Sequence, residues 1–186
     1  MPTPLITTHN LKISQPNKVI INNAEFSINR FDRIILVGKN GCGKSSLLKV
    51  LKGIDTPDEG QIWMAPNIKI DLLEQNPPIP NANNVIDFLS QDNNHPNLSK
   101  INFIIEQLGL SDIDLTKKIS GGELRKIYLA QSILNEPDIM LLDEPTNHID
   151  LPTIHWLEKK LIELNTTMII VSHDQEFLKK IGTKTF

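Results

Sequence analysis

The residues from Gly38 to Ser45 have the types and the spacing of a phosphate-binding loop. They read Gly-Lys-Asn-Gly-Cys-Gly-Lys-Ser and fit the pattern G-x-x-x-x-G-K-[ST]. The glycines let the backbone come close to an anion, so that its N–H groups can converge on phosphate oxygens. The ammonium of Lys44 could then reach the β- and γ-phosphates, and the hydroxyl of Ser45 is a ligand that Mg²⁺ accepts. An ordinary glycine-rich turn with a chance Gly-Lys-Ser is the alternative.

Two carboxylates and a histidine follow apolar segments further along the chain. Residues 139–142 lead into Asp143 and Glu144, so a buried strand would bring both acids to the edge where open α/β sheets bind ligands. Asp143 could act on Mg²⁺ through water, and Glu144 could orient or deprotonate an attacking water. His173 follows the apolar residues 167–171 and could contact a γ-phosphate at the same edge. A solvated sheet edge, and a packed or solvated histidine, are the alternatives.

Ser120 and the two glycines that follow it could form a second anion site. Ser120 is a good N-cap for a helix expected from about Gly122 to Leu134. The amino terminus of a helix presents N–H groups that can bind a γ-phosphate. An ordinary capped helix is the alternative.

The elements that must position these groups follow the pattern of an α/β domain. Short apolar or alternating runs predict strands over 33–37, 61–64, 68–72, 139–142 and 167–171. Helical spacing predicts helices over 46–52, 122–134, 152–164 and 175–180, with shorter ones around 85–89 and 101–108. Residues 5–31 read as β-structure broken by turns at 15–17 and 22–23.

Length and composition limit the classes of protein to which the chain can belong. Its 186 residues suit one domain with a sizeable core, and its formal net charge of -3 at pH 7 gives no general basic signal for nucleic acid. Cys42 is the only cysteine, which excludes an internal disulfide and fits a reducing compartment. The first residues lack the basic start of a signal peptide, and no apolar run approaches the length of a membrane span. We therefore expect a cytoplasmic protein with no transmembrane segment of its own.

Together these motifs resemble those of the ATP-binding cassette (ABC) ATPases over nearly the whole chain. The loop at 38–45 resembles Walker A, Gln75 resembles the Q-loop glutamine, and residues 120–123 resemble the signature motif, with Ile119 where the family usually has leucine. Asp143 and Glu144 resemble the Walker B aspartate and the catalytic glutamate, and Asp150 and His173 resemble the D-loop aspartate and the switch histidine. The order and the spacing of the motifs agree with the family.

The resemblance implies an α/β P-loop NTPase fold of ABC type. A central, mostly parallel sheet would be joined by an antiparallel β-subdomain and a small helical subdomain. The single domain of residues 1–186 would hold the β-subdomain and the P-loop in 1–75, the helical subdomain in 76–135 and the rest of the core in 136–186. Its activity would be the binding and hydrolysis of Mg-ATP by a head-to-tail dimer, in which the signature motif of one cassette closes the site of a second copy or another cassette.

The resemblance also implies a role for each motif residue. Catalysis would involve Glu144, His173 and Gln75, and Mg²⁺ would be held by Ser45, Gln75 and Asp143. ATP would be bound by Gly38, Lys39, Asn40, Gly41, Cys42, Gly43, Lys44, Ser45 and Ser46, and by Ser120, Gly121, Gly122, Glu123 and Asp150.

The pair Asn147-His148 resembles the ABC-F subfamily, whose members are soluble, usually carry two cassettes and act mainly in translation at the ribosome. Importer and exporter cassettes more often have Ser-Ala there. The nucleotide-binding subunit of a membrane transporter, docked to a permease near Gln75, is the second interpretation. A remnant that binds nucleotide without turnover is the third.

Three features depart from the family pattern. The aromatic residue that stacks on adenine is missing from the first strands, where Ile13 is the closest position. No long charged helical hairpin lies between Gln75 and Ser120. The chain ends soon after His173, where the family continues with a further strand and helix, so the resemblance implies a single, truncated cassette.

Overall fold

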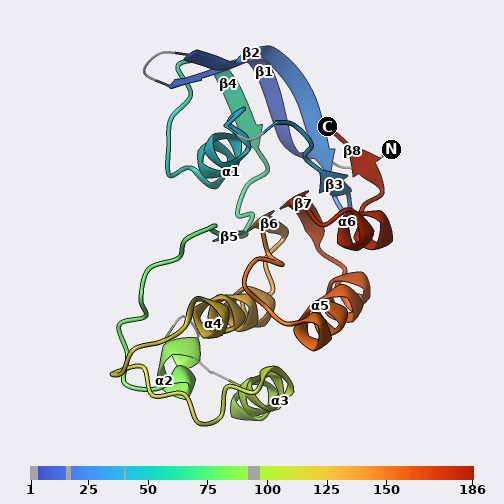
Figure 1. Ribbon diagram of the computed structural model, residues 1–186. Coiled ribbons are helices and arrows are strands. Elements are labelled where there is room, and N and C mark those ends of the chain that lie inside the picture. Colours follow the sequence, from blue (N-terminus) through green and yellow to red (C-terminus); the bar gives the residue numbers. More distant parts are fainter. Residues whose placement is uncertain (1–3, 16–17, 40, 92–96) are drawn as a thin grey trace.

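The computed structural model describes residues 4–15, 18–39, 41–91 and 97–186, and in this part of the chain the strands form two sheets (Figure 1). The parallel sheet has the order β5-β6-β7-β3-β8. Its strands are Ile70–Leu73 (β5), Ile139–Asp143 (β6), Thr167–Val171 (β7), Arg33–Ile35 (β3) and Lys184–Thr185 (β8). The antiparallel sheet has the order β2-β1-β4 and is built from Pro4–Gln15 (β1), Lys18–Asn29 (β2) and Glu59–Met64 (β4). The predicted α/β fold with a parallel and an antiparallel sheet is confirmed.

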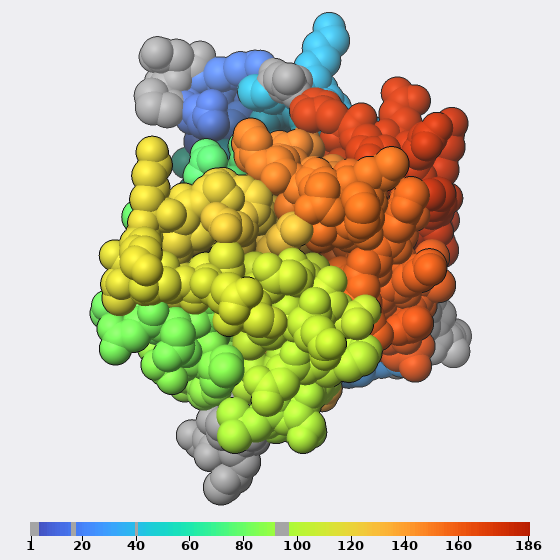
Figure 2. Space-filling model, turned by 60° about the horizontal axis from the view of Figure 1, so that its bottom comes forward, coloured from blue at the N-terminus to red at the C-terminus, as the bar shows by residue number. Residues whose placement is uncertain are grey.

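The helices cover both faces of the parallel sheet (Figure 1). Helix α1 (Lys44–Lys52) lies between the two sheets. The opposite face carries α4 (Gly121–Leu134), α5 (Leu151–Glu163) and α6 (Gln175–Ile181). Helices α2 (Val85–Ser90) and α3 (Leu98–Leu108) pack against α4 and, with it, form the green and yellow part of the face in Figure 2. No helix in the described part of the chain combines the length and the apolar character needed to cross a bilayer.

The alternation of side chains along β6 shows why its continuous apolar sequence forms a central strand. Ile139 and Leu141 belong to the hydrophobic cluster on the α1 side, whereas Met140 and Leu142 belong to the cluster formed with α4 and α5. Successive side chains of a strand point to opposite faces, so a strand that is buried on both faces reads as one apolar run. Strand β7 is buried along its whole length in the same way. Both strands therefore lead directly into the polar residues at their carboxyl ends.

Several details of the sequence prediction were wrong or missing. The turn expected at 22–23 lies inside β2, where Asn23 has φ 54 and the pairing with β1 shifts register. Helix α1 begins at Lys44, two residues before the predicted start, and β5 begins at Ile70. Strand β8 was not predicted, because a two-residue strand carries no periodicity; it pairs in parallel with β3. The turn expected at 15–17 falls largely outside the described residues.

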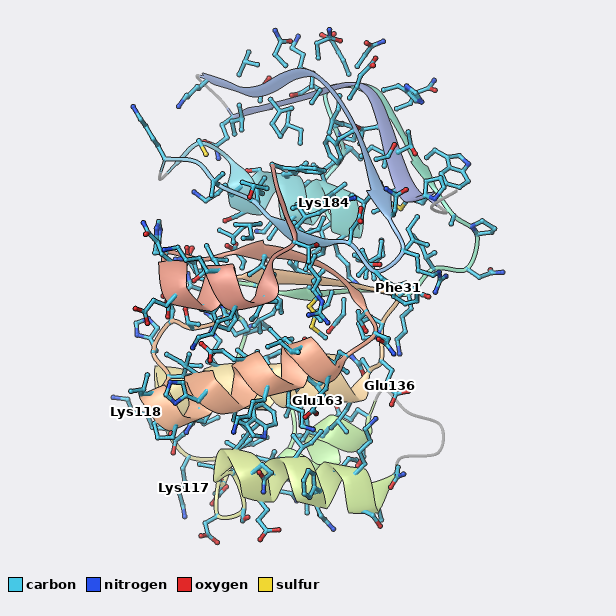
Figure 3. All side chains as sticks on the ribbon, turned by 90° about the vertical axis from the view of Figure 1, so that its right-hand side faces the viewer. Phe31, Lys117, Lys118, Glu136, Glu163 and Lys184 are labelled. Carbon is cyan, nitrogen blue, oxygen red and sulfur yellow. The ribbon has the colours of Figure 1, made fainter. Side chains whose placement is uncertain are left out.

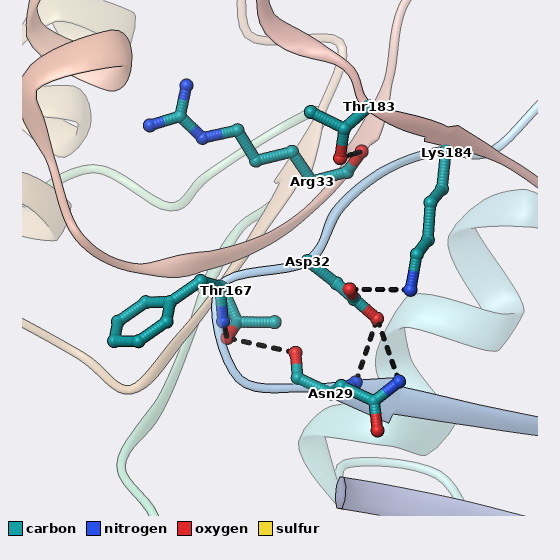
Figure 4. Close-up of polar contacts among 7 residues, drawn as sticks. Asn29, Asp32, Arg33, Thr167, Thr183 and Lys184 are labelled. Carbon is teal, nitrogen blue, oxygen red and sulfur yellow. Dashed lines mark hydrogen bonds and ion pairs between the residues drawn. The ribbon is translucent and has the colours of Figure 1, made fainter. Parts of the chain in front are cut away.

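A partly buried polar cluster connects β8 to the β2–β3 turn (Figure 4). The carboxylate of Asp32 accepts hydrogen bonds from the N–H of Asn29 at 2.9 Å and from Nζ of Lys184 at 2.6 Å. Burial raises the pKa of Asp32, but the hydrogen bonds and the charge of Lys184 outweigh it, so the pKa lies below its ordinary value. The N–H of Phe31 donates to Oγ1 of Thr167 on β7. These contacts stabilise the amino-terminal edge of the parallel sheet.

The amino ends and the carboxyl ends of the parallel strands lie on opposite sides of the molecule. Phe31 and Glu136 precede β3 and β6 and lie on one side in Figure 3, whereas Lys117 and Lys118 lie on the other. Lys117 and Lys118 come from the loop that leads into α4. The amino terminus of α4 therefore lies on the side of the molecule away from the amino ends of the parallel strands.

Candidate nucleotide-binding site

The loop between β3 and α1 leaves the amino terminus of α1 without a side-chain cap. Gly43, the residue before the helix, has φ 94, and no side chain accepts a hydrogen bond from the first turn. Uncapped N–H groups and the positive end of a helix favour an anion. A Cβ atom at Gly43 would lie 1.8 Å from Cγ2 of Ile20, and Gly41 also has a positive φ of 71. Glycine at both positions is thus required by the backbone, and at Gly43 also by the packing of β2 on the loop.

Lys44 folds back over this loop. Its Nζ donates hydrogen bonds to the carbonyl oxygens of Gly38 at 2.8 Å and of Lys39 at 3.2 Å. The ammonium is therefore held at the concave side of the loop, where it can exchange a carbonyl partner for a phosphate oxygen. Charge-assisted hydrogen bonds of this kind are about twice as strong as neutral ones.

A cleft of about 340 Å³ opens in front of this loop at the carboxyl ends of the parallel strands. It brings together predicted site residues from the loop, from the segment after β5 and from the ends of β6 and β7: Gly41, Gly43, Lys44, Ser45, Ser46, Gln75, Asp143, Glu144 and His173. Gln15 and Val171 also line it and were not predicted as site residues. Nine of the residues that the sequence analysis singled out thus lie around one cleft.

Glu144 and His173 are in direct contact within the cleft. Oε2 of Glu144 accepts a hydrogen bond from the backbone N–H of His173 at 3.1 Å, and Oε1 lies 3.3 Å from Nε2 of the same residue. The side chain of Glu144 is 6% exposed, whereas that of His173 is 62% exposed. Glu144 also adopts φ 52, a left-handed conformation that is uncommon outside glycine. The carboxylate is therefore fixed in place, and the imidazole remains open to a ligand.

Arg125 is a structural residue of the site that the sequence analysis did not identify. It lies on α4, is 2% exposed, and donates hydrogen bonds to the carbonyl oxygen of Glu74 at 2.7 Å and to that of Gln75. Burial lowers the pKa of its guanidinium, although the charges of Asp143 and Glu144 act in the opposite direction. Arg125 thus ties α4 to the segment that carries Gln75. No pattern of side chains in the sequence marks Arg125, because its partners are backbone carbonyl oxygens.

The signature-like residues do not line the cleft. Ser120 caps α4: its Oγ accepts from the N–H of Glu123 at 3.2 Å, and Oε2 of Glu123 accepts from the N–H of Ser120 at 2.8 Å. These hydrogen bonds hold the pKa of Glu123 below its ordinary value. A Cβ atom at Gly121 would meet nothing within 4 Å, whereas one at Gly122 would lie 2.5 Å from the carbonyl oxygen of His148. The amino terminus of α4 is therefore open at Gly121 and closely packed at Gly122.

Asp150 also lies outside the cleft and caps α5. Its Oδ1 accepts hydrogen bonds from the N–H and the hydroxyl of Thr153, and its Oδ2 lies 2.6 Å from Nζ of Lys126. The hydrogen bond with Lys126 and those from Thr153 hold the pKa of Asp150 far below its ordinary value. Asp150 and Ser120 thus belong to one surface formed by the amino termini of α4 and α5.

The remaining loop residues support the fold of the loop. The sulfur of Cys42 lies over Gly38, where an added Cβ atom would approach it to 2.6 Å. Gly38, Lys39 and Cys42 belong to the loop without lining the cleft. Asn40 lies outside the described residues.

The residues predicted to hold Mg²⁺ form a suitable set of oxygen donors. Ser45, Gln75 and Asp143 line the cleft and also an adjoining cavity of about 260 Å³. In the residues that the structure describes, no group of three or more His, Cys, Asp or Glu could hold a metal by itself. Mg²⁺ is commonly bound by one or two carboxylates together with phosphate oxygens and water. The donor set therefore fits a Mg²⁺ ion that enters with a nucleotide.

Comparisons with known proteins find relatives for nearly the whole chain. The ABC transporter family model matches residues 21–147. The ATP-binding protein Uup of Buchnera aphidicola subsp. Acyrthosiphon pisum is 40% identical over 97% of this chain and 32% of its own length. Uup of Escherichia coli is 32% identical over 97% of this chain and 35% of its own length. The zinc import ATP-binding protein ZnuC of Rickettsia conorii is 32% identical over 94% of this chain and 78% of its own length.

Two solved structures have the same fold. A structure titled RNase-L Inhibitor superposes with a TM-score of 0.84 at 25% identity and covers 98% of this chain and 36% of its own. A structure titled ATP binding subunit of ABC transporter has a TM-score of 0.80 at 17% identity, covers 96% of this chain and 83% of its own, and supports the fold alone. The expected ABC fold is confirmed, and so is the resemblance to the ABC-F subfamily, to which Uup belongs. This chain spans about a third of the length of the Uup proteins.

Proposed function

Because the chain belongs to the ABC transporter family, we propose that it binds Mg-ATP and hydrolyses it in the cytoplasm, as an ATPase of the ABC-F type. The cleft beside α1 is the observation that carries this proposal. It joins the uncapped helix terminus and Lys44 to the carboxylates of Asp143 and Glu144 and to the exposed imidazole of His173. An anion-binding loop next to a fixed carboxylate is the arrangement that phosphoryl transfer to water requires.

The loop and Lys44 bind the phosphates in this proposal. The N–H groups at the start of α1 and the Lys44 ammonium would hold the β- and γ-phosphates by charge-assisted hydrogen bonds. Ser45, Gln75 and Asp143 would hold Mg²⁺, which supplies positive charge against the phosphate oxygens when it is bound. These contacts would orient the γ-phosphate towards the ends of β6 and β7.

Glu144 orients the attacking water. The N–H of His173 holds one carboxylate oxygen, so the side chain cannot rotate away from the cleft without losing this hydrogen bond. A water between Glu144 and the γ-phosphate would be placed for in-line attack, and the carboxylate would accept its proton. The imidazole of His173 would contact the γ-phosphate, as would the side chain of Gln75.

A second cassette completes the site in this proposal. The residues from Ser120 to Glu123 and Asp150 lie outside the cleft of their own chain, so any contact that they make with ATP would be with the nucleotide of a partner. Gly121 is exposed, and a Cβ atom there would meet nothing within 4 Å, so a γ-phosphate presented by a second copy of this chain or by another cassette would have room to approach it. The dimer would hold two nucleotides between such surfaces.

Binding and turnover by three variants test the proposal. Lys44→Ala should weaken the binding of a fluorescent ATP analogue about ten- to 150-fold, since a charge-assisted hydrogen bond contributes about 1.5–3 kcal/mol. Glu144→Gln should bind ATP and lose phosphate release. Lys159→Ala, which removes an exposed lysine of α5, should match the parent protein in both assays. Unchanged affinity in Lys44→Ala would remove the phosphate-loop assignment, and binding without turnover in the parent would favour the remnant interpretation.

The biological target distinguishes two candidate roles. Association with the ribosome is proposed from Asn147-His148 and from the likeness to Uup proteins. The likeness to ZnuC over 78% of that protein favours the alternative, the ATP-binding subunit of a membrane transporter with a permease partner. In cell fractions from a Glu144→Gln strain, the ABC-F role predicts recovery with ribosomes. Recovery with a permease in the membrane fraction would favour the transporter role.

A further inference from the structure

We propose that the hydroxyl groups of Thr146 and Ser172 position the carboxylate of Glu144 for its action on the attacking water. The two hydroxyl oxygens lie 3.1 Å apart, at hydrogen-bond distance, and join the segments that follow β6 and β7. Neither residue lines the cleft, so both are positioning residues. This inference rests on the proposed function, since it assumes that Glu144 orients a water beside the γ-phosphate.

The pairing of the parallel sheet stops just before the segments that carry Glu144 and His173. The pairing of β6 with β7 ends at Asp143 and Val171. One further backbone hydrogen bond follows, from the N–H of Glu144 to the carbonyl oxygen of Val171 at 2.8 Å. Beyond it, side chains join the two segments, through the carboxylate of Glu144 and through the hydroxyl of Thr146.

The backbone of Glu144 needs such support because its conformation is uncommon. Its φ of 52 lies in the left-handed region, which the Cβ atom of a residue other than glycine disfavours. A conformation of this kind persists only where the surrounding contacts fix it. The N–H of Asn147 donates to the carbonyl oxygen of Glu144 at 3.2 Å, so residues 144–147 form one turn. A contact at Thr146, inside that turn, therefore constrains the backbone of Glu144.

Ser172 is a fixed partner for Thr146. Its Oγ also accepts a hydrogen bond from the N–H of Asp174 at 3.1 Å. Asp174 in turn caps α6, because its Oδ1 accepts a hydrogen bond from the N–H of Phe177 at 3.0 Å. Phe177 is buried in the core beside α5. The hydroxyl of Thr146 is thus connected, through Ser172 and Asp174, to a helix that is anchored by its packing.

The two hydroxyl groups flank the contact between Glu144 and His173. Thr146 is two residues after Glu144, and Ser172 is the residue before His173. The N–H of His173 donates to Oε2 of Glu144, and its Nε2 lies 3.3 Å from Oε1. When the hydrogen bond between Thr146 and Ser172 is lost, the two segments can move apart, and the carboxylate moves with its turn.

Such a movement should affect turnover and not binding. The phosphates would be bound by the loop at 38–45 and by Lys44, which belong to other elements than Thr146 and Ser172. A displacement of about 1 Å in a reacting geometry can cost about 100-fold in rate. An interaction that matters only in the transition state lowers kcat and leaves KM unchanged.

The steady-state kinetics of phosphate release by hydroxyl variants test the inference. Thr146→Val keeps the shape of the side chain and removes the hydroxyl, so kcat should fall about ten- to 100-fold while KM stays within about twofold. Thr146→Ser restores a hydroxyl and should recover kcat to within about threefold of the parent. Ser172→Ala should lower kcat in the same way, and the double variant should lose no more than the worse single variant, because the two residues act through one bond.

Thr167→Val is the matched control. Thr167 lies at the opposite, amino end of β7, and its Oγ1 accepts a hydrogen bond from the N–H of Phe31 at 2.8 Å. The substitution leaves this N–H without its partner, so Tm should fall. Because Thr167 does not line the cleft, kcat and KM should both stay within about twofold of the parent.

The possible outcomes separate this inference from the proposed function. Unchanged kcat in Thr146→Val and Ser172→Ala, or a rise in KM without a fall in kcat, would overturn the inference and leave the proposed function standing. An equal fall of kcat in Thr167→Val would also overturn it, since the loss would then follow from stability alone. A parent protein that releases no phosphate would remove the proposed function, and the inference with it.

Discussion

Replacement of Arg125 by methionine should destabilise the protein more than any exposed substitution on α4. Methionine keeps the length and the apolar stem but removes the guanidinium that bonds to the carbonyl oxygens of Glu74 and Gln75. Two charge-assisted bonds contribute about 3–6 kcal/mol, and the third, to Asp143 at 3.5 Å, is too long to add much. The lowered pKa of Arg125 shows that burial opposes its charge. Because the substitution also removes the desolvation cost of the buried guanidinium, the net loss in free energy of unfolding is about 2–4 kcal/mol.

Thermal and urea unfolding followed by circular dichroism measure this loss. For a domain of this size, about 2–4 kcal/mol corresponds to a fall in Tm of about 4–16 °C. Lys126→Met is the matched control: Lys126 is the next residue on α4 and makes an ion pair with the half-exposed Asp150, so its loss should cost about 1 kcal/mol or less. A fall in stability below about 0.5 kcal/mol for Arg125→Met would refute the view that Arg125 anchors the Gln75 segment to α4.

Three further predictions follow from other contacts. Asp32→Asn should lower stability by about 1 kcal/mol at pH 7. Because the pKa of Asp32 is lowered in the folded state, the difference from the parent in urea titrations should begin to shrink as the pH falls below about 4 and should be lost once the pH is below the folded-state pKa. A difference independent of pH would contradict this. Gly43→Ala should lower the free energy of unfolding by about 1–2 kcal/mol from its positive φ alone. Adding Ile20→Ala should recover only the part of the loss that comes from the clash between the new Cβ atom and Ile20. Full recovery in thermal unfolding would show that the positive φ does not affect stability. Mg-ATP should slow alkylation of Cys42, which belongs to the phosphate loop, and equal rates by mass spectrometry would count against phosphate binding there.

The motifs were predictable where all the residues that define them lie close together in the sequence. The loop at 38–45 carries its glycines and Lys44 together, and the apolar runs of β6 and β7 read directly as strands buried on both faces. Since parallel strands bring their carboxyl ends to one edge of a sheet, the sequence alone predicts Asp143 and His173 at one site, and both line the cleft.

The contacts made between distant segments could not be predicted in this way. Arg125 bonds to backbone carbonyl oxygens, which every residue has, so no side-chain pattern reveals its partners. Gln15 reaches the cleft because the antiparallel sheet packs over α1, and that packing depends on tertiary structure. The turn predicted at 22–23 became a bulge inside β2 because pairing with β1 continues on both sides of it.

The assembly state of Glu144→Gln with Mg-ATP tests most directly the claim that a second cassette completes this site. Loss of the carboxylate charge should stop turnover and reduce repulsion with the γ-phosphate, so an ATP-bound dimer should accumulate. Size exclusion with light scattering should show a doubled mass, Ser120→Arg should restore the monomer, and Ser99→Arg, on the exposed side of α3, should leave the dimer intact. A Glu144→Gln protein that binds ATP and stays monomeric at high concentration would contradict the account.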